Sequence, residues 1–168
     1  MHAGDARGIL NAQAIAAASP RVTALVMGTS DLTKDLHARA TRERLPLLTS
    51  LQLCVLAARS AGITALDGVH LELDDDAGFA AACRQAAEFG FDGKTLIHPR
   101  QVTTANEIFA PAAPDVEWAR RVIAAHADAL TRGHGVAVLD GRLIENLHVD
   151  DARRVLALAD AIAERAVR

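Results

Sequence analysis

The chain contains, at residues 23–36, the segment Thr23-Ala-Leu-Val-Met-Gly-Thr-Ser-Asp31-Leu-Thr-Lys-Asp-Leu36. Its first half is a short apolar run with the length of a fully buried parallel strand. Gly28 ends the run, and small polar residues lead to Asp31. Because α/β enzymes carry their chemistry at the carboxyl ends of parallel strands, the segment predicts a functional site at Asp31. The alternative is structural, since Asp is also a favoured N-cap of a following helical turn.

Helices and strands are expected to alternate around this segment, which is typical of right-handed crossover units on a parallel sheet. Residues 31–44 are expected to form a loop with a helical turn. The expected helices are Ile9–Ala18, Pro46–Ala61 and Ala77–Phe89, and the expected strands are Val22–Met27, Ala65–Leu71 and Lys94–Ile97. The predicted fold class is therefore α/β for residues 1–110.

The chain changes character after Ala110, where Pro111 and Pro114 interrupt it. Two amphipathic helices are expected beyond the break, joined by an extended piece and a tight Asp-Gly turn. Their expected bounds are Asp115–Ala129 and His148–Ala166, with the extended piece at Val136–Leu139. Residues 111–168 are therefore predicted to form a separate helical lobe.

Three parallel strands are too few for a complete sheet of this class. A doubly wound sheet has about five or six strands, and a (β/α)₈ barrel needs eight and typically ~250 residues. With 168 residues, the chain is expected to hold only part of such an architecture.

Composition excludes several classes of partner. The net charge of −3 gives no reason to expect nucleic acid or an anionic membrane surface. No apolar stretch approaches the ~20 residues of a membrane span, and the N-terminus lacks the apolar core of a signal peptide. The two cysteines, Cys54 and Cys83, lie in apolar helical patterns and are interpreted as buried free thiols. A cytoplasmic protein with small-molecule or protein partners is expected.

Five segments together resemble the HpcH/HpaI aldolase and citrate lyase beta subunit family, with the greatest likeness to its malyl-CoA and citryl-CoA lyases. They are Gly8–Ala12, Leu25–Leu32, Ala65–Val69, Gly90–Val102 and Val138–Glu145. The resemblance implies a TIM-type (β/α) barrel followed by a helical lobe that reaches a neighbouring subunit in a trimer or larger homo-oligomer. It also implies that this chain corresponds to the C-terminal half, beginning near the end of the fifth barrel strand and holding about the last three strands.

The resemblance further implies a Mg²⁺-dependent carbon–carbon lyase acting on a CoA thioester. Asp31 matches one of two metal-binding carboxylates, and backbone N–H groups of Gly28, Thr29 and Ser30 would orient the substrate carboxylate. Mg²⁺ prefers hard oxygen ligands and polarises a keto oxygen as a Lewis acid. The other carboxylate is a Glu in the family; counting back from the Gly-Ile-Leu stretch, Gly4 holds its place here.

Glu145 matches the position at which family members carry an Asp that acts as acid/base on the acetyl carbon, offered to the neighbouring subunit's site. Glu keeps the carboxylate and adds a methylene, so proton transfer remains chemically available. A solvated position at the start of the last helix is the alternative interpretation. Asp67 is interpreted either as a polar group satisfied by neighbouring backbone or as a residue behind the site, and His98 as a packed histidine at a strand end or a catalytic group.

Two functions remain open. The first is a Mg²⁺-dependent lyase of malyl-CoA or citryl-CoA, with an acyl-CoA or keto-acid substrate. The second is a truncated non-catalytic remnant or split subunit that needs a partner chain to supply the missing half of the barrel. The sequence favours the first through the intact Gly-Thr-Ser-Asp segment, and the second through Gly4 and the missing strands.

Overall fold

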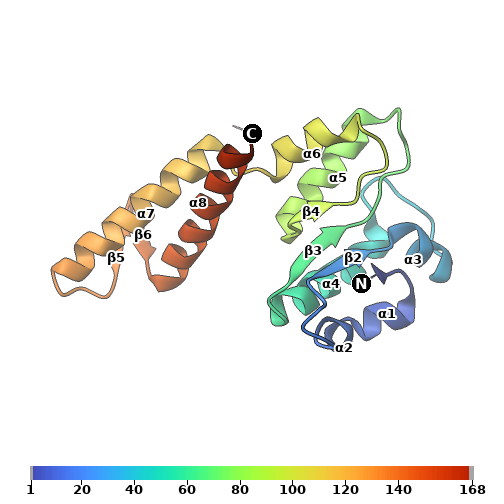
Figure 1. Ribbon diagram of the computed structural model, residues 1–168, viewed down its shortest axis with the longest axis horizontal. Coiled ribbons are helices and arrows are strands. Elements are labelled where there is room, and N and C mark those ends of the chain that lie inside the picture. Colours follow the sequence, from blue (N-terminus) through green and yellow to red (C-terminus); the bar gives the residue numbers. More distant parts are fainter. Residues whose placement is uncertain (1, 167–168) are drawn as a thin grey trace. The chain divides into compact units, whose positions relative to one another are not determined.

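The computed structural model describes residues 2–166, which form two compact units divided between Phe109 and Ala110 (Figure 1). The first unit contains a parallel sheet with helices between its strands. The second contains two long helices and a hairpin. Among the described residues, no helix is both long enough and apolar enough to cross a membrane.

The sheet of the first unit has four parallel strands in the order β1-β2-β3-β4. Since all four run the same way, their carboxyl ends meet at one edge of the sheet. Their bounds are β1 (His2–Ala3), β2 (Ala24–Met27), β3 (Thr64–Asp67) and β4 (Gly93–Lys94).

Helices occupy most of the remaining first unit, so the predicted α/β class is confirmed. They are α1 (Ala6–Leu10), α2 (Ala12–Ala16), α3 (Thr29–Asp35), the 3₁₀ turn η1 (Leu45–Leu47), α4 (Leu48–Ser60), α5 (Asp76–Phe89) and α6 (Gln101–Phe109). Local signals explain the bounds of α5. The Asp75 side chain accepts the Gly78 N–H at its start, and Gly90 adopts the left-handed conformation after its end.

The main core lies on one face of the sheet. Leu25 and Ala65 are fully buried there and pack with α4, through residues such as Leu51. The side chains of Val26 and Leu66 alternate to the opposite face and are only partly buried. The sheet is therefore well covered on one face and incompletely covered on the other.

Three expectations for this unit were wrong. The strand expected over Lys94–Ile97 begins one residue earlier and ends at Lys94, because its partner β3 ends at Asp67, opposite Lys94. The sheet has four strands and not three, because His2 and Ala3 pair in parallel with Val26 and Met27. That pairing is set by the neighbouring strand, since a two-residue strand carries no periodicity of its own. The expected loop after Ser30 contains the helix α3, anchored by the buried side chain of Leu32.

Two expected elements are shorter than predicted. The helix expected over residues 9–18 divides into α1 and α2 at Asn11, whose side-chain amide donates to the Arg7 carbonyl at 2.7 Å. An asparagine that bonds to nearby backbone competes with a continuous helix. The strand expected over residues 65–71 ends at Asp67, because its carboxylate accepts the next backbone N–H, from Gly68.

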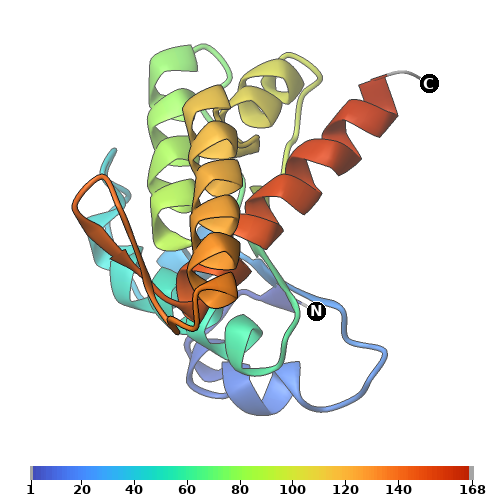
Figure 2. The ribbon, with the colours of Figure 1, turned by 90° about the vertical axis from the view of Figure 1, so that its left-hand side faces the viewer.

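The second unit contains α7 (Ala113–Thr131), β5 (Ala137–Leu139), β6 (Arg142–Ile144) and α8 (Asn146–Ala166). Strands β5 and β6 form an antiparallel hairpin that lies along α7 (Figure 2). Asp140 and Gly141 both have positive φ, 50° and 75°, as a two-residue hairpin turn requires. The expected turn is thus present, and β6 is a strand that the sequence analysis did not identify.

Candidate active site

The predicted site begins where β2 ends. Gly28 precedes the first residue of α3, so the strand passes directly into the helix. Thr29 is buried, whereas Ser30 and Asp31 are exposed. The Leu32 N–H bonds to the Gly28 carbonyl at 2.9 Å, which closes the first turn. Asp31 therefore lies in the first turn of α3, at the carboxyl edge of the sheet.

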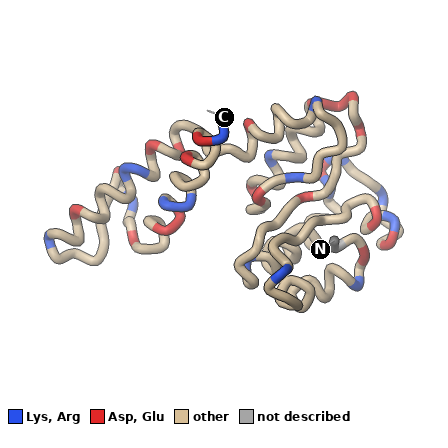
Figure 3. Tube along the Cα trace, in the orientation of Figure 1, with Lys and Arg blue, Asp and Glu red and all other residues tan. Residues whose placement is uncertain are grey.

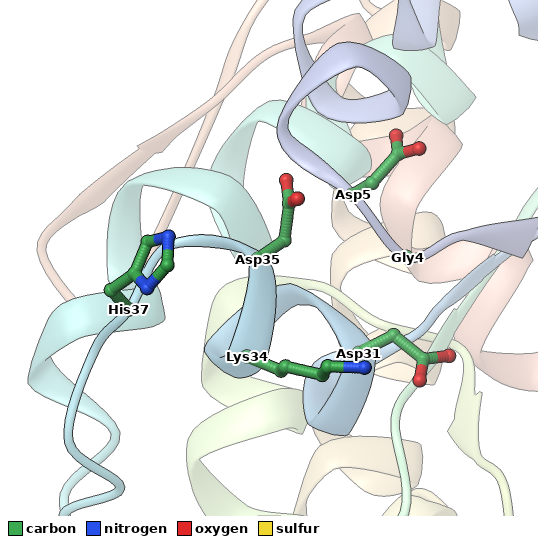
Figure 4. A pocket seen from close by; sticks show the side chains of 6 residues that line it. All are labelled: Gly4, Asp5, Asp31, Lys34, Asp35 and His37. Carbon is green, nitrogen blue, oxygen red and sulfur yellow. The ribbon is translucent and has the colours of Figure 1, made fainter.

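Asp31 lines a cavity of about 540 Å³ that we call the acidic pocket. The pocket joins the end of β1 to α3, so Asp31 and Gly4, which holds the place of the Glu that the family resemblance implies, line the same pocket, with Asp5 beside Gly4. Its lining residues are Gly4, Asp5, Asp31, Lys34, Asp35 and His37 (Figure 4).

Two carboxylates of the acidic pocket are engaged by the start of α1. Asp5 Oδ1 accepts the Gly8 N–H, and Asp35 Oδ2 accepts the Ala6 N–H at 2.7 Å. In Figure 4 the carboxylates of Asp5, Asp31 and Asp35 point in different directions. Within residues 2–166, no group of three or more His, Cys, Asp or Glu side chains is arranged to hold a metal ion.

The side chains that line the acidic pocket fit only a magnesium site in which water or substrate supplies most of the ligands. Mg²⁺ commonly binds through one or two carboxylates and keeps several waters or substrate oxygens in its octahedron. Asp31 offers an exposed carboxylate for such a site, while Gly4 offers no side chain. The acidic pocket therefore does not form a metal centre enclosed by protein ligands.

Thr29 and Ser30 line a different cavity, of about 490 Å³. We call it the arginine pocket, because Arg39, Arg42 and Arg44 also line it. The predicted site residues are thus divided: Asp31 lines the acidic pocket, and Thr29 and Ser30 line the arginine pocket.

His70 also lines the arginine pocket and follows the end of β3. Its ring packs edge-on against Phe79, with 5.8 Å between the ring centroids. The Nε2 atom is buried and makes no hydrogen bond within the described part of the chain; Glu72 Oε2 is 3.8 Å away. This histidine was not among the residues predicted from the sequence, because no local pattern distinguishes it.

Asp67 is buried and forms the centre of a charged cluster. Arg44 Nη1 lies 2.9 and 2.7 Å from its two carboxylate oxygens, and Lys94 Nζ lies 2.7 Å from Oδ2. Burial lowers the pKa of Lys94, and the Asp67 carboxylate opposes that shift. Asp67 was a candidate from the sequence, whereas Arg44 and Lys94 were not. A buried carboxylate requires a cationic partner, yet sequence does not reveal which of the nearby cations supplies it.

The acidic run at residues 74–76 and His98 have structural contacts. Asp75 caps α5, and Arg100 pairs with Asp74 at 3.1 Å, so charges of both signs adjoin at this end of the unit (Figure 3). His98 is exposed, and its Nδ1 accepts the Arg100 N–H at 3.2 Å. The interpretation of His98 as a packed histidine at a strand end was wrong, because the chain has left the sheet and turns there.

Glu145 lies in the second unit, directly before α8. Its backbone N–H donates to His148 Nδ1 at 3.0 Å, and its carbonyl accepts the His148 N–H at 3.0 Å. It therefore occupies the N-cap position of α8, one residue before the helix begins. The side chain is half-buried. Asp31 belongs to the first unit and Glu145 to the second.

Comparisons with known proteins place the chain in a family. Residues 5–99 match the family model described as HpcH/HpaI aldolase/citrate lyase. Over 158 residues the chain is 52% identical to a (3S)-malyl-CoA thioesterase of Cereibacter sphaeroides, covering 94% of this chain and 55% of that protein. It is 37% identical to the citrate lyase subunit beta of Escherichia coli, covering 91% and 51%. The chain thus spans about half the length of the curated relatives that it matches.

Solved structures agree with this assignment. The CitE protein of Mycobacterium tuberculosis, in complex with magnesium, acetoacetate and coenzyme A, superposes with a TM-score of 0.79 at 30% identity, covering 93% of this chain and 58% of that one. A citrate lyase from Burkholderia xenovorans, at 20% identity, shares the fold with a TM-score of 0.81, covering 96% and 52%. The chain belongs to the HpcH/HpaI aldolase/citrate lyase family.

Proposed function

We propose that the protein acts in Mg²⁺-dependent cleavage of a carbon–carbon bond in a 3-hydroxyacyl-CoA thioester of the malyl-CoA or citryl-CoA type, giving acetyl-CoA and a keto acid. One observation carries this proposal: Asp31 presents an exposed carboxylate at the carboxyl edge of a parallel sheet, adjoining the polar Thr29–Ser30 turn. The relatives named above, a malyl-CoA thioesterase and a citrate lyase subunit, support the substrate class.

We also propose that the first unit is part of a TIM-type (β/α) barrel and that residues 111–168 form an oligomerisation or lid lobe. The strands are parallel, and the face that carries Val26 and Leu66 is only partly covered. In a complete barrel, side chains from further strands would fill that face. Relatives of about twice the length are consistent with the missing strands.

Each site residue receives a role in this proposal. Asp31 holds the metal through its carboxylate, and the backbone N–H groups after Gly28, at Thr29 and Ser30, bind the carboxylate of the keto acid. Magnesium, when bound, supplies Lewis-acid polarisation of the oxygen that becomes the keto group. As the carbon–carbon bond breaks, the substrate hydroxyl would give its proton to water, and Glu145 in its protonated form would give its proton to the acetyl carbon. Water then reprotonates Glu145, so one proton is released and one is taken up. A homo-oligomer brings Glu145 of one copy to the site of another.

A second candidate is a split subunit or non-catalytic remnant that works only with a partner chain. Gly4 favours it, because this residue directly follows β1 and lacks the carboxylate that the family resemblance implies there. The partner would then supply both the remaining barrel strands and the second metal ligand.

The test is incubation of the purified chain with malyl-CoA and Mg²⁺, with both possible product pairs measured. Lyase activity yields acetyl-CoA and glyoxylate, whereas thioester hydrolysis yields malate and free CoA. Asp31→Asn keeps the side-chain shape and is expected to lower turnover by about 10²-fold or more, because the metal loses its carboxylate. Asp76→Asn is the matched control, since Asp76 is also an exposed acid in the first turn of a helix.

The outcomes separate the two candidates. Glyoxylate release that depends on Asp31 and not on Asp76 supports the lyase. Equal turnover by wild type and Asp31→Asn rules out the role of Asp31. If the folded chain acts on neither malyl-CoA nor citryl-CoA, and activity returns with a chain carrying the missing strands, the split-subunit function holds.

A further inference from the structure

Three charged side chains form a buried cluster at the carboxyl ends of β3 and β4. The side chain of Asp67 is fully buried, that of Lys94 is 1% exposed and that of Arg44 is 12% exposed. Each carboxylate oxygen of Asp67 accepts two donors. Oδ1 accepts from Arg44 and the Gly68 N–H, and Oδ2 accepts from Arg44 and Lys94. Asp67 thus has no freedom to rotate without breaking charged hydrogen bonds.

All three nitrogens of the Arg44 guanidinium make hydrogen bonds. Besides Asp67, it bonds through Nε to Gln85 Oε1 at 2.7 Å and through Nη2 to the Ala82 carbonyl at 3.3 Å. Its backbone adopts the left-handed conformation, with φ of 55°, which a non-glycine residue rarely adopts. Strained conformations of this kind persist where surrounding contacts over-determine them. The cluster therefore fixes the end of the loop that joins α3 to η1.

The residue after Asp67 contacts the candidate site directly. A Cβ atom on Gly68 would lie 2.3 Å from Thr29 Oγ1 and 2.6 Å from Thr29 Cγ2. Only glycine allows the end of β3 to approach Thr29 so closely. The Asp67 carboxylate accepts the Gly68 N–H and so holds the backbone that contacts Thr29. The same carboxylate binds Arg44, so Asp67 supports two of the residues that line the arginine pocket.

We propose that Asp67 is a positioning residue for the arginine pocket: through Arg44 it holds the loop of residues 36–44, and through Gly68 it sets the location of Thr29. The inference rests on the proposed function, in which the Thr29–Ser30 turn binds the substrate carboxylate. Asp67 lies behind that turn and does not contact the substrate in this proposal. Its role is to hold the turn in the geometry that binds the substrate carboxylate.

Asp67→Asn tests the proposal. The amide has one acceptor oxygen in place of two, and its NH₂ group would face donors that now bond to the carboxylate. Arg44→Lys is the second variant, since it keeps the charge and loses the fork that spans Asp67, Gln85 and Ala82. Asp92→Asn is the matched control. Asp92 pairs with Arg59 and accepts the Ala65 N–H, so it makes comparable bonds away from both pockets.

Hydrogen exchange followed by mass spectrometry provides a readout that does not depend on turnover. Asp67→Asn is expected to speed exchange in residues 36–47 by about tenfold, with Arg44→Lys between it and wild type. Residues 48–60 of α4 should stay protected in all variants, and Asp92→Asn should leave the loop unchanged. Wild-type exchange in residues 36–47 of both site variants overturns the proposal, whatever the activity.

Kinetics then separate positioning from general destabilisation. Where the wild type turns over malyl-CoA, both variants are expected to raise KM by about tenfold with little change in kcat, since substrate binding is what the pocket walls affect. An opened loop with wild-type KM rules out the positioning role. A wild type without any turnover contradicts the proposed function, and the exchange experiment still decides whether Asp67 holds the loop.

Discussion

Single residues decide whether the acidic pocket binds metal. Asp31 is exposed, Asp5 and Asp35 are engaged by the first turn of α1, and Gly4 carries no side chain. The backbone already has the position that a second metal ligand needs, because Gly4, which follows β1, lines the same pocket as Asp31. The shortage lies in side-chain oxygens, which a single substitution can supply.

Gly4→Glu is therefore expected to strengthen metal binding. A second carboxylate in the acidic pocket adds charge and an oxygen ligand, and ligand number sets affinity for hard cations. We expect the affinity for Mn²⁺, used as a spectroscopic substitute for Mg²⁺, to rise about tenfold. Titration with Mn²⁺ followed by electron paramagnetic resonance measures this affinity. Gly135→Glu is the control, because it places the same side chain on a glycine of the other unit. Equal affinity in wild type and Gly4→Glu would show that Gly4 does not face the metal position.

Cys54 gives a prediction about pH. Burial, with a smaller contribution from the Asp67 carboxylate, raises the pKa of its thiol from 9.0 to about 11. Between these values the unfolded chain loses a proton that the folded chain keeps, so the free energy of unfolding falls as pH rises from 9 to about 11. Below pH 9 both states keep the proton, and this effect is absent.

Cys54→Ala is expected to make that decline shallower, measured by urea unfolding at several pH values between 9 and 11. Alanine also leaves a cavity, so the readout is the slope against pH and not the absolute stability. Burial raises the pKa of Cys83 as well, which leaves a residual decline, and the lowered pKa of Lys94 acts in the opposite direction in both proteins. Identical slopes would contradict the assignment.

At the scale of elements, the β5–β6 hairpin is attached to α7 by an aromatic stack. The ring of Trp118 lies under two guanidinium groups, 5.6 Å from that of Arg121 and 5.5 Å from that of Arg142. Arg121 also bonds to both carboxylate oxygens of Asp140 in the hairpin turn, at 2.8 Å each. Because β6 leads directly into Glu145, this attachment positions the proposed acid/base.

Arg142→Gln is expected to weaken the attachment by about 0.5–1 kcal/mol, the size of an exposed cation–π contact. Trp118 is the only tryptophan, so its fluorescence reports on this unit alone during unfolding. Arg120→Gln is the matched control on the same helix, since Arg120 is exposed and pairs with Glu117 at 4.0 Å. Equal unfolding curves for the two variants would rule out a role for the stack.

At the scale of the whole molecule, the first unit leaves apolar surface uncovered. Within residues 2–166, strands β1 and β4 each have a strand neighbour on one side only, and Leu66 and Val26 are partly exposed on the less covered face. Open strand edges and apolar patches usually find a partner. A second copy or a chain carrying further barrel strands would cover both.

The purified chain is therefore expected to run as a dimer or larger species at micromolar concentration, measured by gel filtration with light scattering. Leu66→Lys should shift it toward monomer by placing a charge on the less covered face. Leu10→Lys is the control, because Leu10 is 81% exposed on α1. A wild-type monomer at this concentration would contradict the proposal.

Local patterns in the sequence predict the α/β alternation, the bounds of α5 within one residue at its start and the end of β2 before Asp31. These features follow from apolar periodicity, caps and glycine, which act over a few residues. The tertiary structure decided the rest. It paired β1 with β2, joined Asp67 to Arg44 and Lys94 across 23 and 27 residues, and divided Thr29 and Asp31 between two pockets. Such contacts depend on where distant segments meet, and no local pattern encodes the meeting place.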